Sequence, residues 1–306
     1  MFSGPSLSHS IGEHRGDTDQ RHLCRGFEQT LWLSDGYSPA VTAMMHYRFH
    51  ALTDSGLVRE NNEDALAFDA DRGVAVLADG MGGYNAGEVA SSMAVLFVKS
   101  ELVRWLAVNG AHLSTKRVAQ VIEMCFDEAN LSILNASISN PHYAGMGTTL
   151  VAGVFHGARL VLGHVGDSRC YRLREGVLTQ ITKDHSMLQE QMDAGFLTPE
   201  QAACAPGKNL LTRALGVEEV VRTEVREHQV QDGDLYLMCS DGLTDMMSDK
   251  VILQVLSSDT QLALKATELV ARANINGGRD NISVLLAQAD KTAEKSGLIS
   301  RLFSRP

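Results

Sequence analysis

The order in which strand-like and helix-like segments occur is the strongest constraint on the fold of this chain. Three short apolar runs, at His46–Leu52, Ala65–Phe68 and Val74–Ala78, have the length and composition of β-strands. Two long segments follow, Ala86–Val108 and Val118–Ile138, in which apolar residues recur every three or four positions, as in helices that pack on a sheet. Because strands and helices come in blocks and do not alternate one by one, the pattern predicts an α+β fold with antiparallel sheet.

The second half of the chain continues this block arrangement. Three segments, Thr149–His156, Arg159–Val165 and Cys170–Arg174, are separated by turns that contain glycine, and we interpret them as an antiparallel meander. A polar, helix-prone stretch at Ser186–Arg213 then interrupts the strands. The remaining predicted elements are two strands, a helix and a last strand, at Arg222–Glu227, Asp234–Cys239, Gln261–Asn274 and Ile282–Gln288.

The two ends of the chain differ from this body. Residues 1–45 show no sustained periodicity, so we expect a flexible extension before residue 46. Alternatively, the true start is Met44 or Met45, because the preceding residues carry no readable motif. Residues 291–306 combine apolar and basic side chains in the pattern of a short basic amphipathic helix, and a frayed, solvated terminus is the other interpretation. The sequence thus predicts one folded domain over residues 46–290.

The composition excludes several classes of protein. With 27 Lys and Arg against 37 Asp and Glu, the formal net charge is −10, and no basic cluster stands out that would bind nucleic acid. Five widely spaced cysteines form neither a disulfide framework nor a zinc motif, which favours a cytoplasmic protein. No apolar run reaches the roughly 18–20 residues of a membrane span.

Acidic residues recur where predicted strands meet turns, and they suggest a metal site. Each alone is better explained as an ordinary turn residue, because Asp-Gly and Asp-Asn pairs favour turns. However, Asp79 and Asp241 directly follow apolar strands, so their carboxylates would stand at the mouth of the core and repel one another unless a cation compensates. Ligand sets made only of oxygen favour Mg²⁺ or Mn²⁺ over zinc. The acidic residues concerned are Glu63, Asp64, Asp79, Asp167, Asp241 and Asp280.

Several motifs, in a fixed order, carry a resemblance to a known family. They are Thr53–Arg59 leading to Asn62–Asp64, Asp79–Gly83, Gly147–Thr149, Val165–Arg169, Asp184–Ser186, Ser240–Asp245 and Arg279–Ser283. With these motifs, the chain from about residue 46 to residue 288 resembles the metal-dependent protein serine/threonine phosphatases of the PPM family, type 2C, in their bacterial form. The resemblance implies a four-layer α/β/β/α sandwich, in which helix pairs flank two antiparallel sheets and two Mg²⁺ or Mn²⁺ ions bind at one end.

The resemblance also implies which residues bind these ions. Asp79 would be the ligand shared by both ions, and the carbonyl group of Gly80 would be a further ligand. Asp241 and Asp280 would bind one of the two ions. By the same resemblance, Asp64 belongs with Asp79 and Asp241 to the catalytic set.

Further roles follow from the same resemblance. Glu63 and Asp64 would bind the other ion directly or through water, and Asp167 would help to hold a third, weaker ion. Arg59 would bind the substrate phosphate, for which a guanidinium fork is well suited. The segment Ser186–Arg213 occupies the position of the family's mobile flap. Two histidines near the proposed site, His164 and His185, are better explained as hydrogen-bonded core residues than as ligands.

The implied reaction is hydrolysis of phosphoserine and phosphothreonine in proteins by direct attack of a metal-bridging water, in opposition to a serine/threonine kinase. For the oligomeric state, a monomer is the default expectation. Eukaryotic members have a histidine general acid where this chain has Met81, so the proton for the leaving group would come from elsewhere. Two alternatives remain open, namely a phosphoprotein-binding regulatory module without turnover and an enzyme for small phosphomonoesters.

Overall fold

The computed structural model describes residues 45–83, 86–110, 113–198, 201–202 and 210–291. Two predicted segments, the N-terminal extension up to residue 44 and the tail from residue 292, lie outside the described residues, as do residues 199–200 and 203–209 of the predicted flap. No helix among the described residues is long and apolar enough to cross a membrane.

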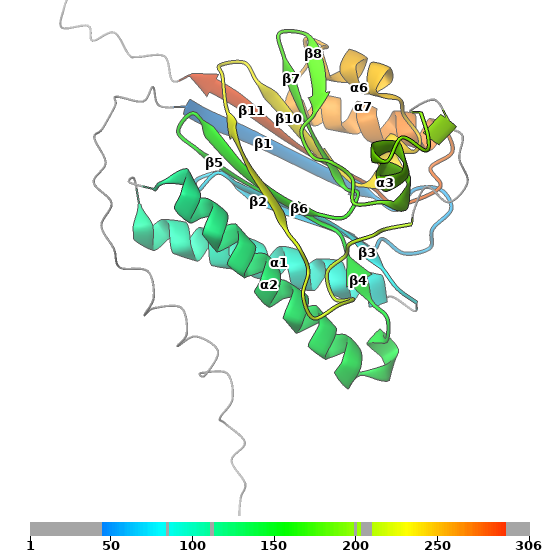
Figure 1. Ribbon diagram of the computed structural model, residues 1–306. Coiled ribbons are helices and arrows are strands. Elements are labelled where there is room, and N and C mark those ends of the chain that lie inside the picture. The colour runs from blue at the N-terminus through cyan, green and yellow to red at the C-terminus, as the bar shows by residue number, and fades with distance from the viewer. Residues whose placement is uncertain (1–44, 84–85, 111–112, 199–200, 203–209, 292–306) are drawn as a thin grey trace, which may run out of the picture. The chain divides into compact units, whose positions relative to one another are not determined.

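Two antiparallel sheets form the centre of the domain (Figure 1). The first sheet has the strand order β1-β11-β10-β7-β8. Its strands are β1 (Met45–Asp54), β11 (Ile282–Lys291), β10 (Leu235–Cys239), β7 (Arg169–Arg174) and β8 (Val177–Gln180).

The second sheet has the order β2-β3-β5-β6-β9, and a short strand, β4 (Gly147–Thr148), pairs with the end of β3. Its strands are β2 (Asp64–Asp69), β3 (Val74–Met81), β5 (Leu150–His156), β6 (Arg159–Val165) and β9 (Glu224–Gln229).

Helices cover the outer face of each sheet. The long helices α1 (Ala86–Asn109) and α2 (Thr115–Ser139) pack on the second sheet, and α6 (Asp249–Leu256) and α7 (Leu262–Ile275) pack on the first. Figure 1 shows the resulting layers, with α6 and α7 above the two sheets and α1 and α2 below them. The predicted α+β class and four-layer sandwich are therefore confirmed.

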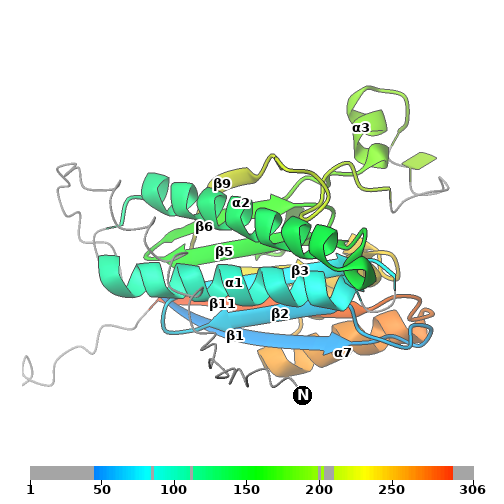
Figure 2. The ribbon, with the colours of Figure 1, turned by 90° about the horizontal axis from the view of Figure 1, so that it is seen from below.

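Short helices also lie outside these pairs. Among the described residues they include a 3₁₀ turn, η1 (Pro141–Tyr143), and the helices α3 (Met187–Asp193) and α5 (Asp241–Thr244). Helix α3 belongs to the predicted flap and stands apart from the four layers in Figure 2.

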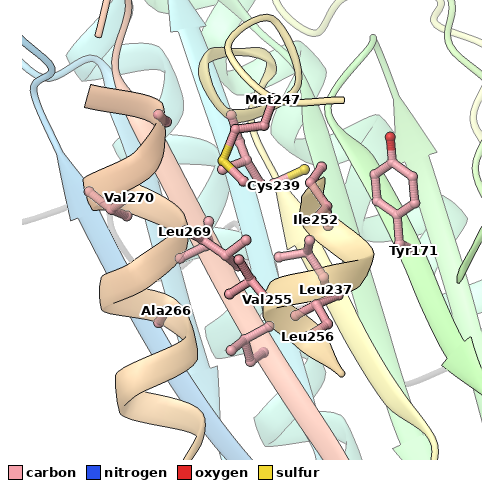
Figure 3. Close-up of a cluster of buried hydrophobic side chains, with 14 of the residues drawn as sticks. Tyr171, Leu237, Cys239, Met247, Ile252, Val255, Leu256, Ala266, Leu269 and Val270 are labelled. Carbon is pink, nitrogen blue, oxygen red and sulfur yellow. The ribbon is translucent and has the colours of Figure 1, made fainter. Parts of the chain in front are cut away.

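The apolar pattern explains why the layers pack as they do. Residues 74–78 of β3 are fully buried, because α1 covers one face of this strand and the opposite sheet covers the other. Between the sheets, the ring of Phe155 meets that of Tyr236 edge-on at 5.3 Å between centroids. A second apolar cluster lies between the first sheet and helices α6 and α7, where Leu237, Ile252 and Leu269 are among the buried residues (Figure 3).

The predicted meander is wrong in its third strand. β5 and β6 pair as expected, but β7 lies in the other sheet, between β10 and β8. The chain crosses between the sheets at Gly166, whose φ of +99° suits glycine, and a Cβ there would lie 2.6 Å from the Thr149 side chain. A hairpin turn and a short sheet crossing have the same local pattern, so the sequence did not distinguish them. Five further elements, η1, β4, β8, α5 and α6, were also not predicted.

Candidate metal centre

The acidic residues gather where the ends of strands from both sheets meet. In the second sheet, the register of β2 and β3 places Asp64 directly opposite Asp79. In the first sheet, Asp241 follows β10 and Asp280 precedes the neighbouring strand β11. The Ser240 hydroxyl donates a 2.7 Å hydrogen bond to Oδ2 of Asp64 and thereby joins the two groups.

Mutual repulsion and burial disturb the titration of these carboxyls. Burial, together with the charges of Asp64 and Asp241, raises the pKa of Asp79 well above its usual range. The pKa of Asp241 is also raised well above its usual range, first by burial and then by Asp167. Burial raises the pKa values of Asp64 and Asp167 to about 6. The structure therefore brings the predicted acidic residues together, and their negative charges repel one another.

This group has the properties of a site for hard divalent cations. Oδ1 of Asp64 is buried and has no hydrogen-bond partner among the described residues. Within the described part of the chain, the one ion pair that involves this acidic group joins Arg59 to Asp280. Oxygen ligands of this kind suit Mg²⁺ or Mn²⁺, whose charge would compensate the repulsion. The residues present therefore fit the implied ions.

Glycines allow the backbone to close around the acidic group. A Cβ on Gly80 would lie 2.1 Å from the carbonyl oxygen of Gly87 at the start of α1, so the strand and the helix meet without room for a side chain. Gly80 also donates its N–H to the Glu63 carbonyl at 3.0 Å. Gly242 packs equally closely against the residue before β11, because a Cβ on Gly242 would lie 2.0 Å from the carbonyl oxygen of Asn281.

Comparison with known proteins places this arrangement in a family. A family model described as Protein phosphatase 2C matches residues 58–275. The chain belongs to the protein phosphatase 2C family. Among its relatives, the serine/threonine phosphatase stp of Listeria monocytogenes serotype 4b is 39% identical over 251 residues, which cover 81% of this chain and 97% of that protein. The serine/threonine protein phosphatase PstP of Mycobacterium tuberculosis is 41% identical over 244 residues, covering 78% of this chain and 44% of that protein.

Solved protein phosphatase 2C structures agree with the fold. The catalytic domain of PstP, in complex with two manganese ions, is 40% identical with a TM-score of 0.71, covering 81% of this chain and 100% of that chain. Serine/threonine phosphatase Stp1 from Staphylococcus aureus is 31% identical with a TM-score of 0.73, covering 83% of this chain and 99% of that chain. The family resemblance inferred from the motifs is thus confirmed.

In this protein phosphatase 2C domain, uncharged side chains fix the backbone of the acidic residues. The Asp79 N–H donates to Oγ1 of Thr149 at 2.9 Å, and the Thr148 hydroxyl donates to the Asp79 carbonyl at 2.8 Å. Thr149 also shares a 2.7 Å hydrogen bond with Ser168, the residue after Asp167. These residues lie within the motifs of the sequence, but no role was predicted for them, because their partners become neighbours only in the folded protein.

Asn281 performs a similar task on the other side of the site. Its Oδ1 accepts the Glu63 N–H at 2.7 Å, and its Nδ2 donates to the carbonyls of Ser55 and Asn61. The loop before β2 is thereby tied to the start of β11. Burial is the largest cause of the raised pKa of Glu63, which lies next to Asp64.

Arg59 lies at the rim of the site. Its Nη2 is 2.7 Å from Oδ2 of Asp280, and its side chain is 51% exposed. The guanidinium therefore reaches the acidic group from solvent, where a phosphate could approach it.

The two histidines are hydrogen-bonded and buried, as predicted. Nε2 of His164 lies 2.8 Å from the Lys183 carbonyl, which fits a donated N–H, and Nδ1 of His185 accepts the N–H of Gly166 at 3.2 Å. Together with Glu224 they offer three ligand atoms within 4.8 Å of one another. However, the Arg213 guanidinium lies 3.2 Å from Nε2 of His185, and its charge opposes a cation there.

Proposed function

We propose that this chain is a metal-dependent protein serine/threonine phosphatase, which hydrolyses phosphoserine and phosphothreonine in proteins. The observation that carries the proposal is the convergence of carboxyl groups from both sheets on one site, where burial and mutual repulsion raise their pKa values. Relatives named serine/threonine phosphatases are about 40% identical over most of this chain and support the same activity.

The proposed ligand set follows the geometry of the site. Asp79 lies among the other carboxyls and is assigned to both ions, with the Gly80 carbonyl beside it. Asp241 and Asp280, from neighbouring strand ends of the first sheet, are assigned to one ion.

The other ion is assigned to Asp64, whose buried Oδ1 has no hydrogen-bond partner among the described residues, and to its neighbour Glu63. Asp167 is assigned with Asp241 to a third, weaker ion, because its charge is among the causes that raise the pKa of Asp241. A PstP structure with two manganese ions supports Mn²⁺ as one suitable metal, and Mg²⁺ has similar ligand preferences.

When bound, two such ions would polarise a phosphoryl oxygen and lower the pKa of water toward neutrality. The side chains of this chain contribute orientation and charge. Arg59 would exchange the Asp280 carboxylate for phosphate oxygens, since a guanidinium binds either anion through the same planar fork. Met81 cannot donate a proton, because its thioether carries none, so it contributes to the shape of the site and not to proton transfer.

The proposal extends to the partners and the location of the enzyme. The substrates would be phosphorylated proteins, and a serine/threonine kinase would be the opposing enzyme. The spacing of the cysteines supports a cytoplasmic protein, and Cys125, Cys170 and Cys239 are free and buried. A monomer is proposed as the default oligomeric state.

The test is hydrolysis of p-nitrophenyl phosphate and of phosphoserine and phosphothreonine peptides with Mn²⁺, with EDTA, and with the variants Asp79→Asn and Asp241→Asn. We expect EDTA and both substitutions to remove nearly all activity. Turnover that survives chelation and both substitutions would refute the metal mechanism. If p-nitrophenyl phosphate were hydrolysed but no phosphopeptide were, the chain would be an enzyme for small phosphomonoesters. Binding of phosphopeptides without turnover of any substrate would indicate a regulatory module.

A further inference from the structure

A cavity of about 580 Å³ lies beside the end of β3. Its wall combines apolar side chains with two guanidiniums and one carboxylate. The wall includes the apolar side chains of Met81, Val217 and Val220, the guanidiniums of Arg213 and Arg222, and the carboxylate of Glu218.

This cavity shares its framework with the acidic group. Met81 is the last residue of β3, two positions after Asp79. β3 pairs here with β4, and Thr148 of β4 exchanges two backbone hydrogen bonds of 3.0 and 2.9 Å with Leu215, in the segment that forms the opposite wall. Because an extended chain advances about 3.3 Å per residue, a substrate residue two or three positions from the phosphorylated one would reach the cavity.

The apolar part of the wall is open to solvent. The side chain of Val220 is 81% exposed and that of Val217 is 53% exposed, although both belong to a cavity next to a proposed catalytic site. An apolar group of a ligand that covers these valines would stabilise the complex, because it removes apolar surface from water.

The charged part of the wall favours an anion. Neither Arg213 nor Arg222 forms an ion pair with another described residue, and the Arg213 guanidinium contacts the imidazole of His185. Since the whole chain carries a net charge of −10, two such guanidiniums form a local exception that would attract a carboxylate. Glu218 in the same wall would disfavour an approach by more than one anion.

We propose that this cavity binds the substrate segment next to the phosphorylated residue, and that it selects an apolar side chain and an acidic side chain in that segment. The inference rests on the proposed function, because the phosphorylated residue must occupy the acidic site. The occupant is therefore an extended phosphopeptide strand of a protein substrate. Met81 and Val220 contact its apolar residue, and Arg222 contacts its carboxylate.

The test of the charge preference compares phosphoserine peptides that carry Leu together with either Glu or Lys within three residues of the phosphoserine. We expect kcat/KM to favour the Glu peptides by about fivefold at low salt. In the variant Arg222→Glu the preference should invert toward the Lys peptides, and in Arg222→Gln it should nearly vanish. Inversion is an informative result, because damage to the fold lowers kcat/KM for both peptide series and cannot reverse their ratio.

Arg72→Glu is the matched control, because it makes the same charge change in the turn between β2 and β3, at the end of these strands opposite Asp64 and Asp79. It should keep the wild-type ratio. If the ratio of kcat/KM for Glu peptides to kcat/KM for Lys peptides were the same in wild type, Arg222→Glu and Arg72→Glu, the inference would be overturned. Hydrolysis of these phosphopeptides would still support the proposed function. If neither p-nitrophenyl phosphate nor any phosphopeptide were hydrolysed with Mn²⁺, the proposed function would fail and this inference with it.

The apolar preference has its own test. Replacing Leu by Ser in the peptide should lower kcat/KM about threefold or more in the wild type, and Val220→Ser should reduce this difference. Val108→Ser is the control, because Val108 is equally exposed, at 81%, but lies near the far end of α1. A Leu-to-Ser difference that is the same in all three proteins would refute the apolar part of the proposal.

Discussion

At the level of single residues, the ion pair between Arg59 and Asp280 links two proposed roles. Arg59 is assigned to phosphate and Asp280 to a metal ion, yet Nη2 and Oδ2 of this pair are 2.7 Å apart. Asp280 cannot direct the same oxygen toward both a cation and the guanidinium at full strength. Binding of a metal at Asp280 would therefore release Arg59 for the phosphate.

The first prediction concerns phosphate binding by Arg59. In Arg59→Lys the charge remains but the planar fork is lost, so we expect KM for p-nitrophenyl phosphate to rise about tenfold with a smaller change in kcat. Steady-state kinetics with saturating Mn²⁺ measures this. Arg48→Lys is the matched control, because Arg48 also forms a 2.7 Å ion pair, with Asp290, at the distant end of the β1–β11 pair. An unchanged KM in Arg59→Lys would remove Arg59 from the binding site.

The second prediction concerns the metal ligand Asp280. Removal of the guanidinium in Arg59→Ala should leave its carboxylate free, so Mn²⁺ should bind more tightly in the absence of substrate. Isothermal titration calorimetry would measure the affinity, with Arg48→Ala as the control. Weaker or equal Mn²⁺ binding by Arg59→Ala would argue against the competition between Arg59 and the metal.

At the level of elements, the close contact between α5 and the start of β11 positions Asp241 relative to Asp280. The third prediction is that Gly242→Ala lowers the free energy of unfolding by about 1–3 kcal/mol and reduces activity, because its Cβ would meet the Asn281 carbonyl oxygen at 2.0 Å. Urea unfolding and phosphatase assays would measure both effects. Gly83→Ala is the control, since a Cβ there meets nothing within 4 Å. Equal stability of the two variants would show that this contact is not required.

Elements with a long periodic pattern were predicted well from the sequence. The predicted helices at residues 86–108 and 118–138 correspond to α1 and α2, because their apolar stripes extend over many turns. β7 was placed in the wrong sheet, since the choice of sheet depends on pairing with β10, which lies more than 60 residues later. α6 was not predicted, because eight residues contain only about two helical turns and show too few repeats of the helical period. Its residues Ile252, Val255 and Leu256 are nevertheless buried.

The candidate site shows the same division. The acidic residues were found from their motifs, and the structure brings them together. The hydrogen bonds of Thr149 and Asn281 were not predicted, because they depend on the register between strands that are distant in sequence. The cavity beside Met81 also could not be predicted, since its opposite wall comes from residues more than 120 positions away.

At the level of the whole molecule, the acidic site joins two sheets that would repel each other there without cations. Asp64 belongs to the second sheet and receives its hydrogen bond from Ser240, which follows a strand of the first. Any charge that accumulates at this junction acts on the packing of both sheets. The stability of the metal-free protein should therefore depend on the ionisation of these carboxyls.

The fourth prediction is that the metal-free protein loses stability as the pH rises from about 4 to 7. The pKa of Asp64 is raised to about 6 in the folded protein, mainly by burial, whereas an unfolded chain has its ordinary pKa of about 4. The folded state therefore binds the proton more tightly, and this stabilising contribution is complete below pH 4 and disappears as the pH rises through 6. For Asp64, which is 8% exposed, the loss is on the order of 3 kcal/mol.

Urea unfolding in EDTA at several pH values would measure this loss in the wild type, in Asp64→Asn, and in Asp71→Asn as a control at the exposed turn beyond the other end of β2. Asp64→Asn should gain stability relative to the wild type as the pH rises, because its amide cannot ionise, while Asp71→Asn should follow the wild type. Saturating Mn²⁺ should restore the wild type at pH 7 more than it restores Asp64→Asn, because the cation replaces the proton as the partner of the carboxylate. If all three proteins changed in parallel with pH, and Mn²⁺ stabilised them equally, ionisation of Asp64 would not control the junction between the sheets.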